Sequence, residues 1–241
     1  MSKGKVVVLE GLDGSGKGTQ HKLLVRALQE LGFDIVTKDF PDYDTPSGQV
    51  VKQYLNGELS QNPYAISYKQ ASVLFAVNRL MVYQIELKEK HEAGSHMVLD
   101  RYSTSNWLYQ GAKINLGRLE AIEWLRRFEH EELELPYPDQ VIYLDVPGRI
   151  SKELLQVRYK GDETKKDIHE RDLDYQHEAR NTGLLCAREY GWSIVHCGKP
   201  GYEEILESSE FATKRNFSDV LRSIEDIHEE VLKETVKVLR R

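Results

Sequence analysis

The chain has 241 residues, 40% of them hydrophobic and 30% charged, which is enough for one sizeable core and is ordinary for a soluble globular protein. Its 33 basic and 39 acidic residues give a net charge of −6, which argues against general nucleic-acid binding, because that needs a basic surface. No apolar run reaches the 18 or so residues that span a membrane, and two cysteines, Cys186 and Cys197, are too few for a disulfide framework, so we expect a cytoplasmic protein with no nucleic-acid or membrane partner.

Short β-branched runs alternate with helical patterns along the chain. The expected strands are Lys5–Glu10, Phe33–Lys38, His96–Leu99, Gln140–Val146 and Trp192–His196. The expected helices are Thr19–Leu31, Ala65–Ala93, Arg118–Glu132, Arg171–Glu189 and Phe217–Leu239, the last entered after Asn216. The apolar cores VVVL, MVL and VIYL are continuous, which is typical of parallel strands covered on both faces. The pattern predicts a doubly wound α/β fold with a central five-stranded parallel sheet and helices on both faces.

A highly charged stretch, from Arg158 to Arg180, follows the fourth strand. Such a stretch is usually a solvated helix face, but its place directly after a strand favours a mobile helical lid over about residues 149–175. Because we find no internal repeat and no linker, we expect a single domain over residues 1–241.

The strongest motif is a glycine-rich loop between the first strand and the first helix, which is the context that a P-loop requires. Its glycines allow backbone N–H groups to face phosphate oxygens, and the helix N-terminus adds partial positive charge. Lys17 is expected to reach the β- and γ-phosphates of ATP. The predicted ATP-binding residues are Gly11, Asp13, Gly14, Ser15, Gly16, Lys17, Gly18 and Thr19.

The motif departs from its plainest form after the lysine. Gly18 stands where a serine or threonine is usual, and the hydroxyl comes one position later, at Thr19. The ending Gly-Lys-Gly-Thr-Gln resembles that of adenylate-kinase-like proteins. The hydroxyl ligand of Mg²⁺ is therefore either Thr19 or a water molecule.

Further segments resemble those of thymidylate kinases, in the same order along the chain. They are LEGLDGSGKGTQ from Leu9, FPDYDT from Phe40, LFAVNR from Leu74, DRYSTSNWLYQG from Asp100, and Pro138-Asp139 leading into QVIYLDV. The resemblance covers residues 5 to 197, roughly. It implies a P-loop NTPase-type nucleoside monophosphate kinase that transfers the γ-phosphoryl group of MgATP to dTMP, giving dTDP and ADP, and that forms a homodimer.

Asp100 and Arg101 follow the third expected strand, at the end of a parallel strand where ligands bind in open α/β sheets. An acid there can hold Mg²⁺ or order its waters, and an arginine can clamp phosphate through two hydrogen bonds. A surface ion pair is the structural alternative. In the resembled family this aspartate and arginine serve the phosphates of both substrates, so Asp100 and Thr19 are the expected metal ligands.

The resemblance also implies an acceptor site. Phe75 and Arg79 share a helix face, a pattern that usually indicates core packing beside a solvated arginine. In the resembled family, however, the phenylalanine stacks on thymine and the arginine contacts a thymine carbonyl. Asp13 would hold the acceptor's 3′-hydroxyl. The expected acceptor-binding residues are Asp13, Phe40, Tyr43, Phe75, Arg79, Arg101, Ser105, Asn106, Tyr109, Gln110 and Glu170.

The chain differs from the thymidylate kinase pattern at two places where a positive charge is expected beside phosphate. The P-loop carries no arginine, so the lid should supply charge to the transition state; Arg158 is the first candidate, with Lys160 and Arg171 behind it. The expected catalytic residues are thus Lys17, Asp100, Arg101 and Arg158. After Phe-Pro many thymidylate kinases place an arginine that grips the acceptor phosphate, whereas this chain has Asp42.

Three arrangements are open around Asp42. It points away and leaves Arg101 to hold the phosphate, Lys38 fills the gap, or the acceptor is not dTMP. We favour the first, and expect Asp42→Arg to lower the KM for dTMP if Asp42 occupies the arginine's place.

Two other functions stay open. One is another monophosphate kinase acting on dUMP, dCMP or a similar acceptor, because a thymine methyl group is worth only about 1–3 kcal/mol of discrimination. The other is a catalytically weakened nucleotide-binding regulatory protein. An assay of ATP turnover with dTMP separates these possibilities.

Overall fold

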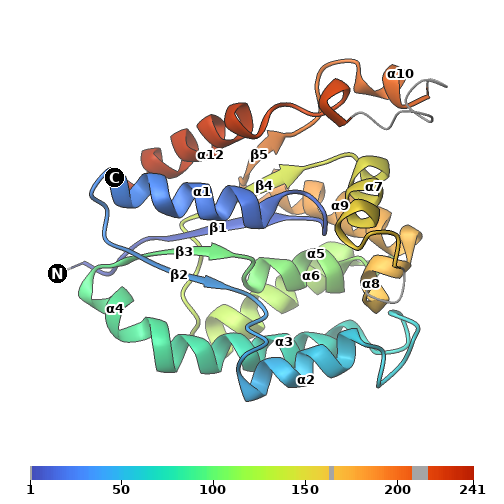
Figure 1. Cartoon of the computed structure of the whole chain (residues 1–241). Helices are drawn as coiled ribbons and strands as arrows, with labels where there is room; N and C mark the ends of the chain where they lie inside the picture. Colours follow the sequence, from blue (N-terminus) through green and yellow to red (C-terminus); the bar gives the residue numbers. More distant parts are fainter. Residues whose placement is uncertain (1, 163–165, 208–216) are drawn as a thin grey trace.

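Five parallel strands form the centre of the structure, a computed structural model that describes residues 2–162, 166–207 and 217–241 (Figure 1). The strands are β1 (Val6–Gly11), β2 (Ile35–Asp39), β3 (His96–Asp100), β4 (Gln140–Asp145) and β5 (Ser193–His196). They lie in the order β2-β3-β1-β4-β5, and every pairing is parallel. The predicted five-stranded parallel sheet is confirmed, and each strand overlaps its predicted range.

Helices cover both faces of this sheet, as the sequence predicted (Figure 1). Every residue of β1 is buried, and its side chains alternate between two cores. Val7 and Leu9 pack in one core with residues of α1 (Lys17–Glu30) and α12 (Ile224–Leu239). Val6 and Val8 pack in the other with residues of α5 (Ser103–Gly111) and α9 (Leu173–Tyr190). Burial of each such side chain contributes about 1.5–3 kcal/mol, which explains the continuous apolar run of a central strand.

The predicted helices are all present, with different ends. They are α1 (Lys17–Glu30), α3 (Tyr68–Val82) with η1 (Tyr83–Leu87) and α4 (Lys88–Ala93), α6 (Arg118–Arg127) with η2 (Phe128–Glu132), α9 (Leu173–Tyr190) and α12 (Ile224–Leu239). The segments η1 and η2 are π-helical turns, which the helical period of a sequence does not separate from α-helix. Helix α3 begins after Ser67 rather than at Ala65, because Ser67 and Gln70 form a capping box,.

The predicted start of the last helix, at Phe217, is wrong. Phe217–Asp219 form one 3₁₀ turn, η4, and Leu221 bridges Gly198 in an antiparallel pairing. Helix α12 begins only after Ser223, whose side chain accepts a hydrogen bond from the backbone of Asp226. Asn216, the expected entry point, lies outside the described residues.

The period of the sequence missed α2 (Pro46–Leu55), α5 (Ser103–Gly111) and α10 (Tyr202–Glu207). Helices α7 (Gly148–Arg158) and α8 (Ile168–Arg171) fall in the predicted helical lid. Helix α2 did carry a local signal, because Thr45 caps it and a proline follows at the first helical position,. None of the helices in the described part of the chain combines the length and apolar character that a membrane span requires.

Candidate active site

The glycine-rich loop joins β1 to α1 as predicted, and three of its glycines adopt positive φ. Gly11 has φ 149°, Gly14 has φ 78° and Gly16 has φ 82°, values that residues with a Cβ rarely adopt. A Cβ at Gly14 would also lie 2.7 Å from the carbonyl oxygen of Ser151 on α7. The loop conformation and its contact with the lid therefore both depend on glycine at position 14.

Lys17 folds back onto the loop that precedes it. Its Nζ donates to the carbonyl oxygens of Gly11, at 2.9 Å, and Leu12, at 2.7 Å. The side chain is buried, and burial, followed by repulsion from Arg101, lowers the pKa of Lys17 to about 8. The amine therefore has internal partners that phosphate oxygens would have to replace.

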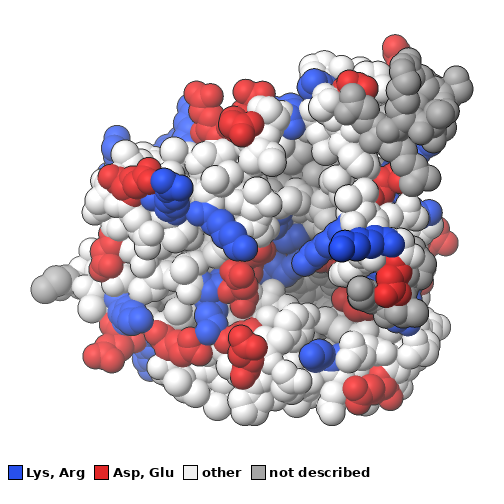
Figure 2. All heavy atoms as spheres, viewed as in Figure 1, with Lys and Arg blue, Asp and Glu red and all other residues white. Residues whose placement is uncertain are grey.

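A cavity of about 1000 Å³ opens in front of this loop, at the carboxyl ends of the strands. All the predicted ATP-binding residues line it except Gly11, which is buried and contributes its carbonyl oxygen to Lys17. Figure 2 shows basic side chains gathered around the hollow on this face. The basic residues that line the cavity are Lys17, Lys22, Lys52, Arg101, Arg158 and Arg222. Positive charge thus concentrates here although the chain is acidic overall, as a polyphosphate site requires.

Arg101 and Asp13 form the central ion pair of the site. Arg101 has φ 66°, and its Nη2 donates to Asp13 Oδ1 at 2.5 Å. Tyr109 donates its hydroxyl to the other oxygen of Asp13 at 2.8 Å. Burial would raise the pKa of Asp13, but the charges of Arg101 and Lys17 outweigh it and hold that pKa at about 2. This pair stands at the junction of the large cavity with a smaller one, because both residues line both.

The smaller cavity brings together the predicted acceptor residues. Those that line it are Asp13, Phe40, Tyr43, Phe75, Arg79, Arg101, Ser105, Asn106, Tyr109 and Gln110. Glu170, the remaining one, lines the large cavity instead. Both amide atoms of Gln110 are buried without a hydrogen-bond partner, which in a native site points to a ligand or water that completes them.

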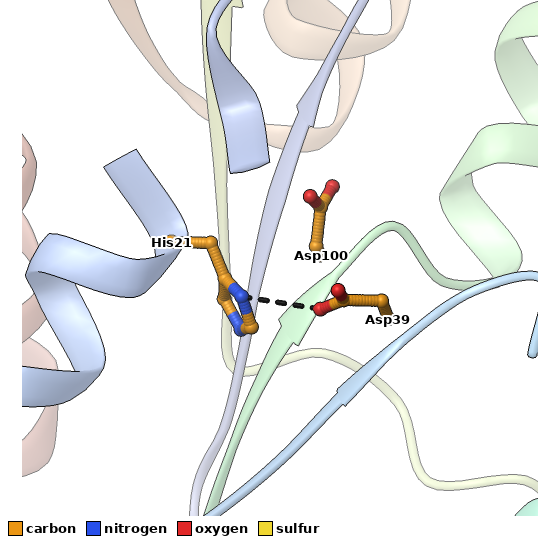
Figure 3. A group of neighbouring side chains, drawn as sticks. All are labelled: His21, Asp39 and Asp100. Carbon is orange, nitrogen blue, oxygen red and sulfur yellow. Dashed lines mark ion pairs between the residues drawn. The ribbon is translucent and has the colours of Figure 1, made fainter. Parts of the chain in front are cut away.

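Asp100 lies at the edge of the large cavity, where β3 ends beside β2. It is in register with Asp39, and Figure 3 shows His21 reaching from α1 toward these two strand ends. The ring nitrogen His21 Nδ1 lies 3.2 Å from Asp39 Oδ1, and ligand atoms of the three residues lie within 4.8 Å of one another. Within the described residues, no side chain forms a hydrogen bond or ion pair with the Asp100 carboxylate. Its oxygens are thus available to a cation at the cavity.

The lid contributes two short helices, α7 and α8, at the same end of the sheet (Figure 1). Arg158, at the end of α7, lines the large cavity. Arg171 instead bonds Gln61 outside both cavities, and Lys160 lines neither. The Tyr159 hydroxyl donates to Glu170 at 3.0 Å, which ties α7 to α8. Residues 163–165 of the expected lid lie outside the described part.

Asp42 points away from both cavities. Its Oδ2 pairs with Lys38 Nζ at 2.7 Å, and the same amine bonds Glu86 at 2.6 Å, so neither Asp42 nor Lys38 lines a cavity. Tyr43, the next residue, lines both. Tyr43 therefore reaches the acceptor cavity, while Asp42 takes the outward direction that we favoured from the sequence. Because position 42 faces Lys38 instead of the cavity, we no longer expect Asp42→Arg to add a phosphate contact.

Sequence reasoning also missed residues that shape the site. Glu10 is fully buried at the end of β1 and accepts hydrogen bonds from Thr104, at 2.7 Å, and Ser105, at 2.8 Å. Asp167 and His169 of the lid line the smaller cavity. Glu10 had a visible signal, an acid that follows the apolar run of the first strand, whereas the lid residues come together only through the fold.

Comparisons with known proteins agree with this geometry. A family model described as thymidylate kinase matches residues 9–208. A thymidylate kinase of Plasmodium falciparum (isolate 3D7) is 30% identical over 98% of this chain and 91% of its own length. A probable thymidylate kinase of Pyrococcus abyssi is 29% identical over 85% of this chain and 93% of its own. The solved structure of thymidylate kinase from Candida albicans is similar with a TM-score of 0.59 and 25% identity, over 81% of this chain and 84% of that one. The chain belongs to the thymidylate kinase family.

Proposed function

We propose that the protein transfers the γ-phosphoryl group of MgATP to dTMP, giving dTDP and ADP. The observation that carries the proposal is the junction of two cavities at Arg101 and Asp13, one lined by the P-loop and the other by aromatic and amide side chains. Two nucleotides bound there would meet with their phosphates at Arg101. One domain, residues 1–241 with its lid, would carry both sites.

The chemistry requires positioning and charge neutralisation, without a covalent intermediate. A phosphate oxygen of dTMP attacks the γ-phosphorus, and the bond from that phosphorus to the β–γ bridging oxygen breaks. In the proposed roles, Lys17 neutralises the β- and γ-phosphates, Arg101 holds the acceptor phosphate, and Arg158 meets the charge of the moving group. The P-loop amides hold the donor in line.

Mg²⁺ fits the residues beside the P-loop. The Asp100 carboxylate is unengaged by any described side chain, and a Cβ at Gly18 would lie only 3.6 Å from its Oδ2. Thr19 lines the same cavity, and such oxygen atoms are the ligands that Mg²⁺ prefers. Asp100 would hold the ion or order its waters, with the Thr19 hydroxyl as the second candidate ligand. The ion would neutralise phosphate charge during transfer.

The lining of the smaller cavity supports the acceptor roles that the family resemblance implies. Phe75 would stack on the base, Arg79 would donate to a base carbonyl oxygen, and Asp13 would accept from the 3′-hydroxyl of the sugar. Tyr43 and Tyr109 line the same cavity, where they would enclose the nucleotide and exclude water.

We also propose that the protein is a cytoplasmic homodimer. Helix α3 and the π-turn after it expose an apolar stripe at four-residue spacing, made of Val73, Val77, Met81 and Ile85. Such a stripe is typical of a surface that packs on another helix. Cys186 and Cys197 are buried and unpaired, which supports a reducing compartment. Sedimentation should give twice the mass of the chain, and Val77→Asp should give single chains; a monomeric wild type would contradict the dimer.

A coupled assay of ADP release against a panel of nucleoside monophosphates tests the activity. We expect turnover with dTMP above dUMP and dCMP, and near-complete loss of it in Lys17→Ala with the fold retained by circular dichroism. Preference for another monophosphate would replace dTMP as the acceptor. Absence of turnover with every acceptor would indicate a nucleotide-binding regulatory protein.

A further inference from the structure

Glu129 is a fully buried carboxylate behind the smaller cavity, on the π-helical turn η2. It accepts two hydrogen bonds from Arg79, from Nε at 2.6 Å and from Nη2 at 2.7 Å. Its Oε1 also accepts from Asn106 Nδ2 at 2.7 Å. One acid thus holds two residues of the smaller cavity, Arg79 and Asn106, although Glu129 itself lines neither cavity.

These bonds fix which groups remain for a ligand. A carboxylate only accepts, so the amide nitrogen of Asn106 must face Glu129, and its second hydrogen goes to the carbonyl oxygen of Ser72 at 3.2 Å,. The amide oxygen Asn106 Oδ1 bonds no donor in the described ranges. Arg79, with Nε and Nη2 engaged, keeps Nη1 free of any partner among those same residues. The cavity therefore offers a fixed acceptor and a fixed donor.

We propose that Glu129 is a positioning residue that sets this polarity and thereby selects a 4-oxo pyrimidine over a 4-amino pyrimidine. The inference rests on the proposed function. A thymine or uracil edge presents an N3 hydrogen to Asn106 Oδ1 and the O4 acceptor to Arg79. Cytosine presents the reverse, an N3 acceptor and an N4 amino donor. The acceptor Asn106 Oδ1 would then face another acceptor, and the donor Arg79 would face another donor.

Gln110 cannot make this choice alone. Its amide has no protein partner, so it can rotate to present either its oxygen or its nitrogen. Asn106 lacks that freedom only because Glu129 and Ser72 occupy its nitrogen. In Glu129→Gln the new amide would place N–H groups against Arg79 or Asn106, and a rotated Asn106 would then present its nitrogen to the base.

The test compares dTMP, dUMP and dCMP in wild type, Glu129→Gln, Glu129→Asp and Glu131→Gln, by equilibrium binding and by kcat/KM. Glu131 is the matched control, two residues along the same turn, because it pairs with Arg126 and Arg127 at the surface. Each preference is a ratio within one preparation, so a partly unfolded variant does not distort it.

We expect Glu129→Gln to lower the preference for dTMP over dCMP, in affinity and in kcat/KM, about ten-fold or more, because the substitution removes hydrogen bonds to a charged group. The change should fall mainly on KM and affinity, with the ratio of dTMP to dUMP unchanged. Glu129→Asp and Glu131→Gln should keep the wild-type preference. An unchanged ratio of dTMP to dCMP in Glu129→Gln, or an equal fall of that ratio in Glu131→Gln, overturns the inference. In either case, turnover of dTMP by the wild type still supports the proposed function. A wild type inactive with all three acceptors refutes the function itself.

Discussion

Removal of the Arg158 side chain should slow phosphoryl transfer with little effect on ATP binding. Arg158 lines the large cavity at the end of α7, where its guanidinium carbon lies 5.7 Å from the centre of the Tyr159 ring. It forms no ion pair with any residue that the structure describes, so its charge is available to a ligand. A unit charge about 4 Å from a phosphoryl oxygen, at an effective dielectric constant of about 20, contributes about 4 kcal/mol. That is about a 1000-fold effect on rate.

Steady-state and single-turnover kinetics of Arg158→Ala measure this effect. We expect kcat to fall by about that factor while the KM for ATP changes little, because the interaction strengthens mainly in the transition state. Arg171→Ala is the control, since Arg171 bonds Gln61 away from both cavities, and it should behave as wild type. Wild-type kcat in Arg158→Ala would refute the reasoning, and a selective loss in Arg171→Ala would move the role to that residue.

Three further predictions follow from the same site. Lys17, with a pKa of about 8 in the free protein, is about half neutral at pH 8, and a bound phosphate favours its charged form. MgATP binding at pH 8 should therefore take up protons, which isothermal titration in buffers of different ionisation enthalpy detects. The variant Lys17→Met should lack this uptake. Asp100→Asn should lower kcat and raise the Mg²⁺ concentration for half-maximal rate about ten-fold; an unchanged magnesium titration would leave Asp100 a structural role. Tyr43→Arg should lower the KM for dTMP about ten-fold by adding a charge-assisted hydrogen bond, whereas Asp42→Arg should leave that KM nearly unchanged. A larger fall of the KM in Asp42→Arg than in Tyr43→Arg would contradict the inference that position 43 faces the acceptor.

The sequence predicted the parts of the site that lie on short local motifs. The P-loop and the Asp100–Arg101 pair each follow a buried strand, and parallel strands bring their carboxyl ends to one edge. The outward direction of Asp42 was the arrangement favoured from the sequence, but its cause was not predicted, because Asp42 pairs with Lys38, which also bonds Glu86 on a distant element. The burial of Glu129 was likewise out of reach, since a π-turn within a charged helical pattern changes which side faces the core,.

The helical period also fails where a segment is short or is held by tertiary contacts. Helix α8 has four residues and is stabilised by a capping box between Asp167 and Glu170, which is too short for a periodic pattern to register. The start of α12 is delayed because the backbone before it bonds to the loop after β5, where Arg222 donates its N–H to the carbonyl oxygen of Cys197.

The hydrogen bonds of Lys17 and Arg101 have a consequence for how tightly substrates can bind. In the structure each cation already has partners within the protein, the carbonyl oxygens of Gly11 and Leu12 for Lys17 and the carboxylate of Asp13 for Arg101. An arriving phosphate therefore exchanges with existing partners rather than meeting bare charges, which lowers the net gain from ground-state binding. On departure of the products the same partners return, so release leaves no unsatisfied charge behind. Binding by exchange favours turnover over retention, since affinity for the ground state adds nothing to the rate of the chemical step.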